Sequence, residues 1–125
     1  FRTGTWQGYS DTDLNAIVDL GSQKEISSIS LGFLEDQRSW IFLPIEVEFY
    51  ISSDNKTFQK VATEKIDSTK PAEKVSIRKV QFSFKDKKVR YVKVIAKKLG
   101  VLPTWHLGYS HDGRSWLFVD EIEIK

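Results

Sequence analysis

Apolar and polar side chains alternate along much of the chain with a period of two, the pattern of a β-strand with one face in a core and one in solvent. The clearest example is the segment of residues 44–51. Its apolar side chains, from Ile45 to Ile51, fall on one face, while Glu46 and Glu48 fall on the other. This alternation predicts an antiparallel strand whose glutamates lie on a solvated face.

Further segments of the same kind predict a protein made of strands. Residues 53–56 have the composition of a turn, and residues 58–62 are expected to return beside the first strand as a hairpin. The other predicted strands are residues 16–20, 26–34, 75–84, 89–97 and 117–124. Gly21 is expected to end the first of these, a shift in the alternation predicts a bulge near Lys79, and residues 86–88 are predicted to form a turn. With almost no helical period, the chain is predicted to be all-β, an antiparallel β-sandwich.

Two segments break the alternation and carry the candidate binding residues. The two segments are residues 35–43 and residues 100–116. The second is long for a connection between strands and rich in aromatic residues, and such loops are often functional. The faces of Trp and Tyr rings can pack against the C–H faces of sugar rings, while Arg and His can donate hydrogen bonds to sugar hydroxyls. The predicted carbohydrate-binding residues are Arg38, Trp40, Trp105, His106, Tyr109 and Arg114.

The opposing interpretation is that these rings close the ends of the hydrophobic core, since large aromatic side chains most often serve packing. For Trp40 and Trp105 the sequence leaves both interpretations open. Trp116 is flanked by Leu117 and Phe118, so we expect it to pack in the core.

Length, charge and composition narrow the classes of function. At 125 residues the chain is predicted to be a single domain. No stretch reaches the roughly 18 to 20 apolar residues that a membrane-spanning helix needs, so no membrane span is expected. The net charge of +2, with lysines interleaved with acidic residues, argues against nucleic acid as a partner. The chain has no Cys, which excludes disulfides and thiolate metal sites, and no Met, from which we expect a part of a longer protein.

The candidate catalytic groups do not form a site. Residues 110–112 are Ser, His and Asp, but neighbours in sequence cannot converge as nucleophile, base and orienting acid. His106 and His111 lie five residues apart, yet a zinc site would need two further ligands. We therefore expect no catalytic residues and no enzymatic activity in this chain.

Short motifs in a fixed order connect the chain to a known family. These motifs are Gly4-Thr5-Trp6-Gln7-Gly8, Asp13-Leu14, Val18-Asp19-Leu20-Gly21, Trp40-Ile41-Phe42-Leu43-Pro44, Ser52-Ser53-Asp54, Arg90-Tyr91-Val92-Lys93-Val94, Pro103-Thr104-Trp105-His106 and Trp116-Leu117-Phe118-Val119-Asp120-Glu121-Ile122. In this order and spacing, the chain resembles an F5/8 type C (discoidin-like) domain. More narrowly, it is similar to the family 32 carbohydrate-binding modules at the C-terminus of bacterial family 20 β-N-acetylhexosaminidases.

The resemblance implies more than the pattern does. It implies a galactose-binding-like jelly roll that binds sugar in loops at one end, and a structural calcium ion with Glu121 among its ligands. The family usually begins with a further strand before the Trp6 motif, so we expect residues 1–125 to be one domain that lacks its first strand. The resemblance also implies a parent glycoside hydrolase that is secreted, periplasmic or at the bacterial cell surface, whose catalytic domain would be a partner in the same polypeptide.

Three functions are therefore candidates for this chain. The leading one is a non-catalytic module that binds galactose or N-acetylhexosamine-type sugars through its end loops. The second is a structural domain that packs against the catalytic domain and has no ligand of its own. The third is a domain that binds a membrane or protein surface through apolar side chains of residues 40–43, as other discoidin-like domains do.

Overall fold

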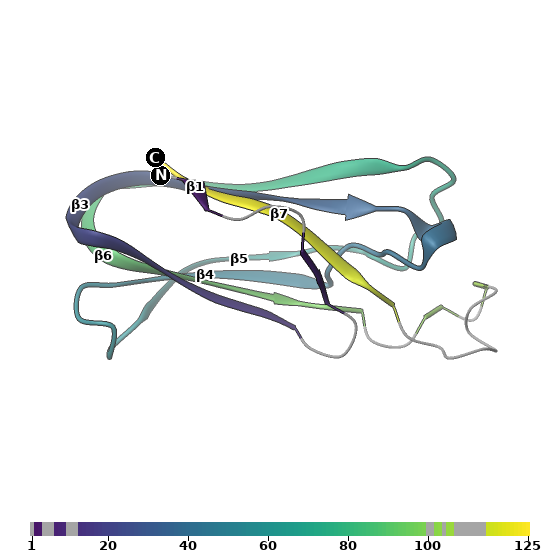
Figure 1. Ribbon diagram of the computed structural model, residues 1–125, viewed down its shortest axis with the longest axis horizontal. Coiled ribbons are helices and arrows are strands. Elements are labelled where there is room, and N and C mark those ends of the chain that lie inside the picture. The colour runs from purple at the N-terminus through teal and green to yellow at the C-terminus, as the bar shows by residue number, and fades with distance from the viewer. Residues whose placement is uncertain (1, 4–6, 10–12, 100–101, 104, 107–114) are drawn as a thin grey trace.

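The chain folds into two antiparallel layers of strands that face each other across an apolar core (Figure 1). The computed structural model describes residues 2–3, 7–9, 13–99, 102–103, 105–106 and 115–125. Its elements are β1 (Arg2–Thr3), β2 (Gln7–Tyr9), β3 (Leu14–Glu35), the short 3-10 helix η1 (Gln37–Ser39), β4 (Glu46–Ser52), β5 (Gln59–Lys65), β6 (Ser76–Lys97) and β7 (Leu117–Ile124). Among the described residues, no helix has the length and apolar character that crossing a membrane would require.

Two long strands belong to both layers. β3 and β6 have 22 residues each and pair with each other from end to end. The pairing shifts between Asp19 and Lys24 and again just after Ile26, and such irregularities bend a strand. Gly21 lies in the first shift with φ of 88°, a conformation that glycine adopts without the clash a Cβ would cause. Figure 1 shows both strands curving around one end of the molecule in this region.

The strand order is β1-β7-β3-β6-β4-β5, with β2 also paired to β7. One layer holds β7, the second half of β3 and the first half of β6. The other layer holds the first half of β3, the second half of β6, β4 and β5. Side chains that point between the layers form one core, which includes Ile29, Leu31, Phe33, Val47, Phe49, Val80, Val92, Val94 and Leu117. The predicted all-β antiparallel sandwich is confirmed.

Several predicted strand ends are wrong, although the last strand, β7, has the predicted bounds. Gly21 does not end a strand, and residues 86–88 do not form a turn, because β3 and β6 each continue through these positions. Lys87 pairs with Ile26 across the two strands. Turn composition expresses a local preference, whereas the pairing of two long strands satisfies the backbone hydrogen-bonding groups of both.

The bulge predicted near Lys79 is also wrong. Residues 76–83 of β6 pair with β3 without a shift. The apparent change in alternation arises because Val75 and Ile77 point outward, with 63% and 61% of their surface exposed, while Val80 points into the core. An exposed apolar pair was therefore mistaken for core positions.

Glu48 corrects the prediction of a solvated glutamate on β4. Only 7% of its side chain is exposed, although it points away from the apolar core. The Nζ atom of Lys60 lies 2.6 Å from one carboxylate oxygen, and the Nζ atom of Lys97 lies 3.5 Å from the other. The hydroxyl of Tyr50 donates a hydrogen bond of 3.1 Å to the same carboxylate. Long side chains from three strands thus cover a charge that alternation alone places in solvent.

Glu48 should make the stability of the domain depend on pH. The hydrogen bond from Lys60 lowers the pKa of Glu48 below its ordinary value of 4.5, and this outweighs the opposing effect of burial. A carboxyl with a lowered folded-state pKa stabilises the fold above the unfolded-state pKa, and that stabilisation is lost as pH falls through the folded value. We therefore expect the melting temperature of the wild type to fall more steeply than that of Glu48→Gln on acidification below about pH 5. Thermal denaturation followed by circular dichroism checks this.

The matched control is Glu64→Gln, since Glu64 is also paired, to Arg78 at 3.5 Å, but 42% of its side chain is exposed. This control should keep the acid dependence of the wild type, because exposed pairs contribute little to stability. Parallel pH profiles for the wild type and Glu48→Gln would contradict the assignment.

Candidate functional site

Three connections meet at the end of the sandwich opposite the bend of β3 and β6 (Figure 1). η1 follows β3, residues 66–75 lead from β5 to β6, and residues 98–116 lead from β6 to β7. Of the last connection, residues 98–99, 102–103, 105–106 and 115–116 are described. The topology therefore brings together chain segments that are about 70 residues apart in sequence, as the contact between residues 37 and 106 shows.

Gln37 ties the three connections to one another. Its Nε2 donates to the carbonyl of Lys70 at 2.9 Å, and its Oε1 accepts from the backbone N–H of Ala72 at 2.8 Å. Its own carbonyl accepts the N–H of Trp40 at 3.1 Å and contacts Nε2 of His106. Because a carbonyl can only accept, a hydrogen bond in this contact requires a hydrogen on Nε2 of His106. Gln37 is 5% exposed, so this hydrogen-bonding centre is buried beneath the surface.

Above Gln37 lies an open hollow of about 480 Å³. Volumes of about 300 to 1,000 Å³ are typical of sites for small ligands. The hollow is lined by Gln37, Arg38, Trp40, Pro71, Ala72, Glu73, Trp105 and His106. Four of the six predicted binding residues, Arg38, Trp40, Trp105 and His106, are thus brought to one place.

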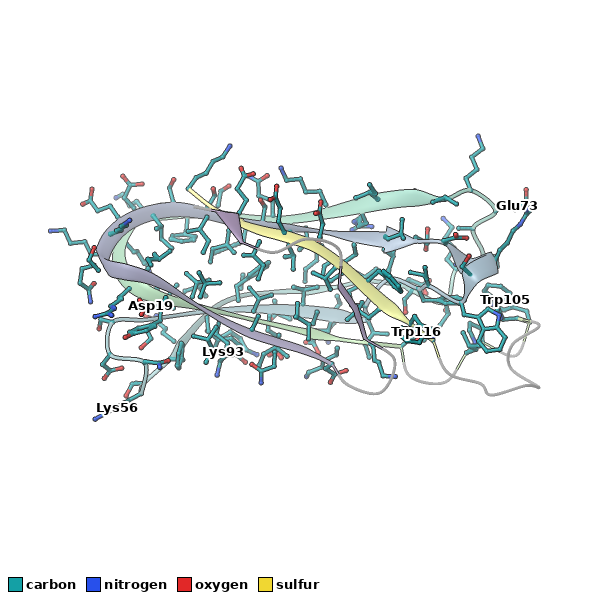
Figure 2. The ribbon with its side chains drawn as sticks, viewed as in Figure 1. Asp19, Lys56, Glu73, Lys93, Trp105 and Trp116 are labelled. Atoms are coloured by element: carbon teal, nitrogen blue, oxygen red, sulfur yellow. The ribbon has the colours of Figure 1, made fainter. Side chains whose placement is uncertain are left out.

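Trp105 is the most exposed of the aromatic residues that line the hollow. The residue is 47% exposed, and its Nε1 donates to the carbonyl of Thr69 at 3.2 Å. The indole N–H is therefore used within the chain, and the ring offers an apolar surface in a fixed orientation. Figure 2 shows Trp105 at the same end of the molecule as Glu73, another lining residue.

The aromatic lining rests on a buried ring. Phe42 is 1% exposed, and its ring centroid lies 5.3 Å from that of His106 and 6.1 Å from that of Trp105. The His106 and Trp105 centroids are 5.8 Å apart, and Trp40 meets His106 edge to face at 6.2 Å. These four residues form one cluster, with Phe42 at the base and Trp105 at the surface.

Trp40 has a backbone conformation that is rare for a bulky residue. Its φ of 65° and ψ of 23° lie in the left-handed region, at the end of η1. Such a conformation costs on the order of 1 to 3 kcal/mol outside glycine and is held by its surroundings. Here the N–H of Trp40 donates to Gln37, and its carbonyl accepts the N–H of Trp116 at 2.7 Å. The strain is thus located on the wall of the hollow.

Not every predicted position behaves as expected. Trp116 is 41% exposed rather than in the core, and it is not among the residues that line the hollow. Its flanking residues misled the prediction, because Leu117 faces the core while Trp116 and Phe118 lie on the outer side of β7. Tyr109 and Arg114 lie outside the described residues, as do residues 110–112.

The calcium prediction depends on Glu121. The structure places Glu121 in β7, half-buried, where its backbone N–H donates to the Asp120 carboxylate at 2.7 Å. Within the described part of the chain, no three His, Cys, Asp or Glu side chains gather as a metal site would require. Calcium takes about six to eight oxygen ligands, so the described residues alone do not fit it. Calcium at Glu121 stays a prediction, and no step below depends on it.

The residues that hold the walls of the hollow in place were not identified from the sequence. Gln37, Ala72 and Glu73 belong to no recognisable motif. The sequence does not distinguish a loop glutamine with buried hydrogen-bond partners from one that is solvated. One feature of the sequence does point to the wall formed by Pro71, Ala72 and Glu73. Residues 67–71, Asp-Ser-Thr-Lys-Pro, have the composition of a turn, which indicates a structured connection. That composition does not say which other loop the connection meets.

The F5/8 type C domain family matches the chain over residues 2–122. The chain belongs to this family. No curated protein sequence is significantly similar to this F5/8 type C domain.

Two solved structures are similar to the chain at low sequence identity. One is a family 32 carbohydrate-binding module (CBM32-1) of a family 31 glycoside hydrolase from Clostridium perfringens, with a TM-score of 0.58, 21% identity, and coverage of 95% of this chain and 75% of that one. Another is CpGH89CBM32-5 from Clostridium perfringens, solved in complex with GalNAc-β-1,3-galactose, with a TM-score of 0.47, 18% identity, and coverage of 87% of this chain and 66% of that one. The first likeness shows the fold.

Proposed function

We propose that this F5/8 type C domain is a non-catalytic carbohydrate-binding module that holds a sugar in the hollow above Gln37. The observation that carries the proposal is the convergence of Arg38, Trp40, Trp105 and His106 on that hollow. These side chains come from two connections far apart in sequence, and both apolar rings and polar groups face one opening.

The lining supplies the two kinds of contact that a sugar needs. The exposed face of Trp105 can pack against the C–H groups on one side of a pyranose ring. The guanidinium of Arg38 can donate to hydroxyls, and the carboxylate of Glu73 can accept from them. Both of these residues are exposed beside the rings, so they can reach a ligand without large rearrangement.

The proposal includes the class of sugar and the parent protein. The ligand is a galactose or N-acetylhexosamine-type sugar, and the parent is a bacterial glycoside hydrolase of the β-N-acetylhexosaminidase type, secreted, periplasmic or at the cell surface. The catalytic domain of that protein is the intramolecular partner, and a calcium ion at Glu121 is part of the same proposal. Family membership and the motifs along the chain support it.

Calorimetric titration with galactose, N-acetylgalactosamine, N-acetylglucosamine and GalNAc-β-1,3-galactose tests the proposal. We expect at least one of these to bind, and we expect Trp105→Ala to weaken that binding about tenfold or more, which corresponds to about 1.4 kcal/mol. Trp116→Ala is the matched control, because Trp116 is also exposed but does not line the hollow.

Two results would count against the proposal. Equal losses in the two Trp variants would place the ligand elsewhere or indicate a general structural effect. No binding of any sugar by the intact domain would favour a structural role beside a catalytic domain.

A further inference from the structure

The outer face of the β7–β3–β6 layer, away from the hollow above Gln37, carries a glycine, charged side chains and exposed apolar side chains close together. Ile29, Leu31 and Phe33 of β3 face the core, so the alternate residues Ser30, Gly32 and Leu34 face outward. On this face each has a partner on β6: Gln81 beside Ser30, Lys79 beside Gly32 and Ile77 beside Leu34.

Gly32 lies in the middle of this face and, having no side chain, leaves a depression there. A Cβ atom at Gly32 would come within 3.3 Å of the Cγ2 atom of Ile77 and 3.4 Å of the Cβ atom of Asp120. The side chains of β6 and β7 therefore border the glycine on its two sides. They enclose a shallow hollow of about 160 Å³, which Lys79 and Glu121 also line.

In the row of Gly32 the charges are separated by strand. The β6 side carries Lys79, and the β7 side carries Asp120 with Glu121 and Glu123, of which Glu123 is paired to Lys125 at 3.0 Å. Neighbouring strands lie about 4.8 Å apart, so with β3 between them Lys79 and Asp120 are about 10 Å apart. Within the described residues, neither takes part in an ion pair, although the Asp120 carboxylate accepts the N–H of Glu121.

Apolar surface lies next to these charges. Ile77 is 61% exposed and Val75 is 63% exposed, which is high for β-branched apolar side chains. The two point outward on the same side of the chain as Lys79, so the face combines an apolar row with a charged row.

We propose that this face is the interface with a second copy of the chain. The two copies are related by a two-fold axis that runs parallel to β3, just above the outer face. Rotation about this axis places the β6 side of one copy over the β7 side of the other. Each residue keeps its position along the strand direction. Lys79 of each copy then lies over Asp120 of its partner, because both belong to the row of Gly32. The interface is isologous, so the same ion pair forms twice.

The same rotation places β3 of one copy over β3 of the other. Leu34 of one copy meets Leu34 of the other, and Ile77 lies over the β7 side of its partner. Two sheets can stack face to face at about 10 Å, and the depression at Gly32 leaves room for side chains of the second copy. Charge complementarity is what selects a second copy, since the cation and the acid that it needs are both on this one face.

Sedimentation velocity of the intact chain over a hundredfold concentration range tests this, with two variants of opposite charge change. Lys79→Glu and Asp120→Lys each put like charges opposite each other in a homodimer, so we expect either variant to associate about tenfold or more weakly than the wild type. In an equimolar mixture of the two variants, both contacts join opposite charges again. We therefore expect dimers to return in the mixture and not in either variant alone.

The control is Lys56→Glu, the same charge change in an exposed turn at the other end of the molecule (Figure 2). It should dimerise like the wild type, and circular dichroism should show all variants folded. A monomeric wild type at every concentration would overturn the proposal, as would variants that dimerise like the wild type or a mixture that stays monomeric. The measurement involves no sugar, so its outcome is independent of the proposed carbohydrate site.

Discussion

Replacing Phe42 with alanine is expected to lower the free energy of unfolding by about 3 to 5 kcal/mol and to abolish sugar binding. Phe42 is 1% exposed, and its removal leaves a cavity that the surrounding strands can fill only in part. The rings of His106 and Trp105 rest on it at centroid distances of 5.3 Å and 6.1 Å, so they would lose their base. Urea denaturation measures the stability, and calorimetry with the sugar that the wild type binds measures the function.

Two controls separate the loss of stability from the loss of the site. Phe49 is also 1% exposed but lies in the centre of β4, so Phe49→Ala should destabilise the fold by a similar amount and leave the affinity of the folded domain unchanged. Phe42→Leu keeps most of the volume and should recover part of both properties. If Phe49→Ala removed binding as fully as Phe42→Ala, the special role of Phe42 would be refuted.

Replacing Gln37 with alanine is expected to lower the free energy of unfolding by about 2 to 3 kcal/mol. The substitution removes two side-chain hydrogen bonds and leaves the Lys70 carbonyl and the Ala72 N–H without their partner. Residues 66–75 would then no longer be held against η1, and the wall of the hollow would move. We therefore expect the affinity for sugar to fall about tenfold or more, although Gln37 itself is nearly covered.

The conservative variant Gln37→Glu distinguishes positioning from simple loss of packing. A carboxylate can still accept from Ala72 but cannot donate to the Lys70 carbonyl, and its charge would be buried without a cation, so we expect this variant to be destabilised at least as much as the alanine variant although the side-chain volume is kept. Gln59→Ala, at an exposed position of β5, should change neither stability nor binding. An unchanged affinity in Gln37→Ala would show that the loops keep their positions without this residue.

The alternation along the chain was enough to predict the sandwich, and the reason is visible in single strands. Val47, Phe49 and Ile51 face the core as their spacing requires, and β7 has its predicted bounds. Alternation failed where the neighbour across the sheet decides exposure. Glu48 is covered because Lys60 and Lys97 lie on adjacent strands, which no local pattern can express.

Some residues of the candidate site could be predicted from the sequence, and others could not. Residue types picked out Arg38, Trp40, Trp105 and His106, because rings and planar donors in long loops are identifiable without coordinates. Gln37 could not be found, since its importance lies in three partners from distant parts of the chain.

By itself, the sequence determined that this protein is a β-sandwich of the F5/8 type C family, because a period of two and a series of short motifs are properties of neighbouring residues. Only the tertiary structure decided that η1, residues 66–75 and residues 105–106 meet around Gln37, and that Lys79 and Asp120 flank Gly32 on one face. The physical reason is that strand pairing is a long-range interaction. It brings β3, β6 and β7 together, and the loops and surface charges take their positions from that pairing.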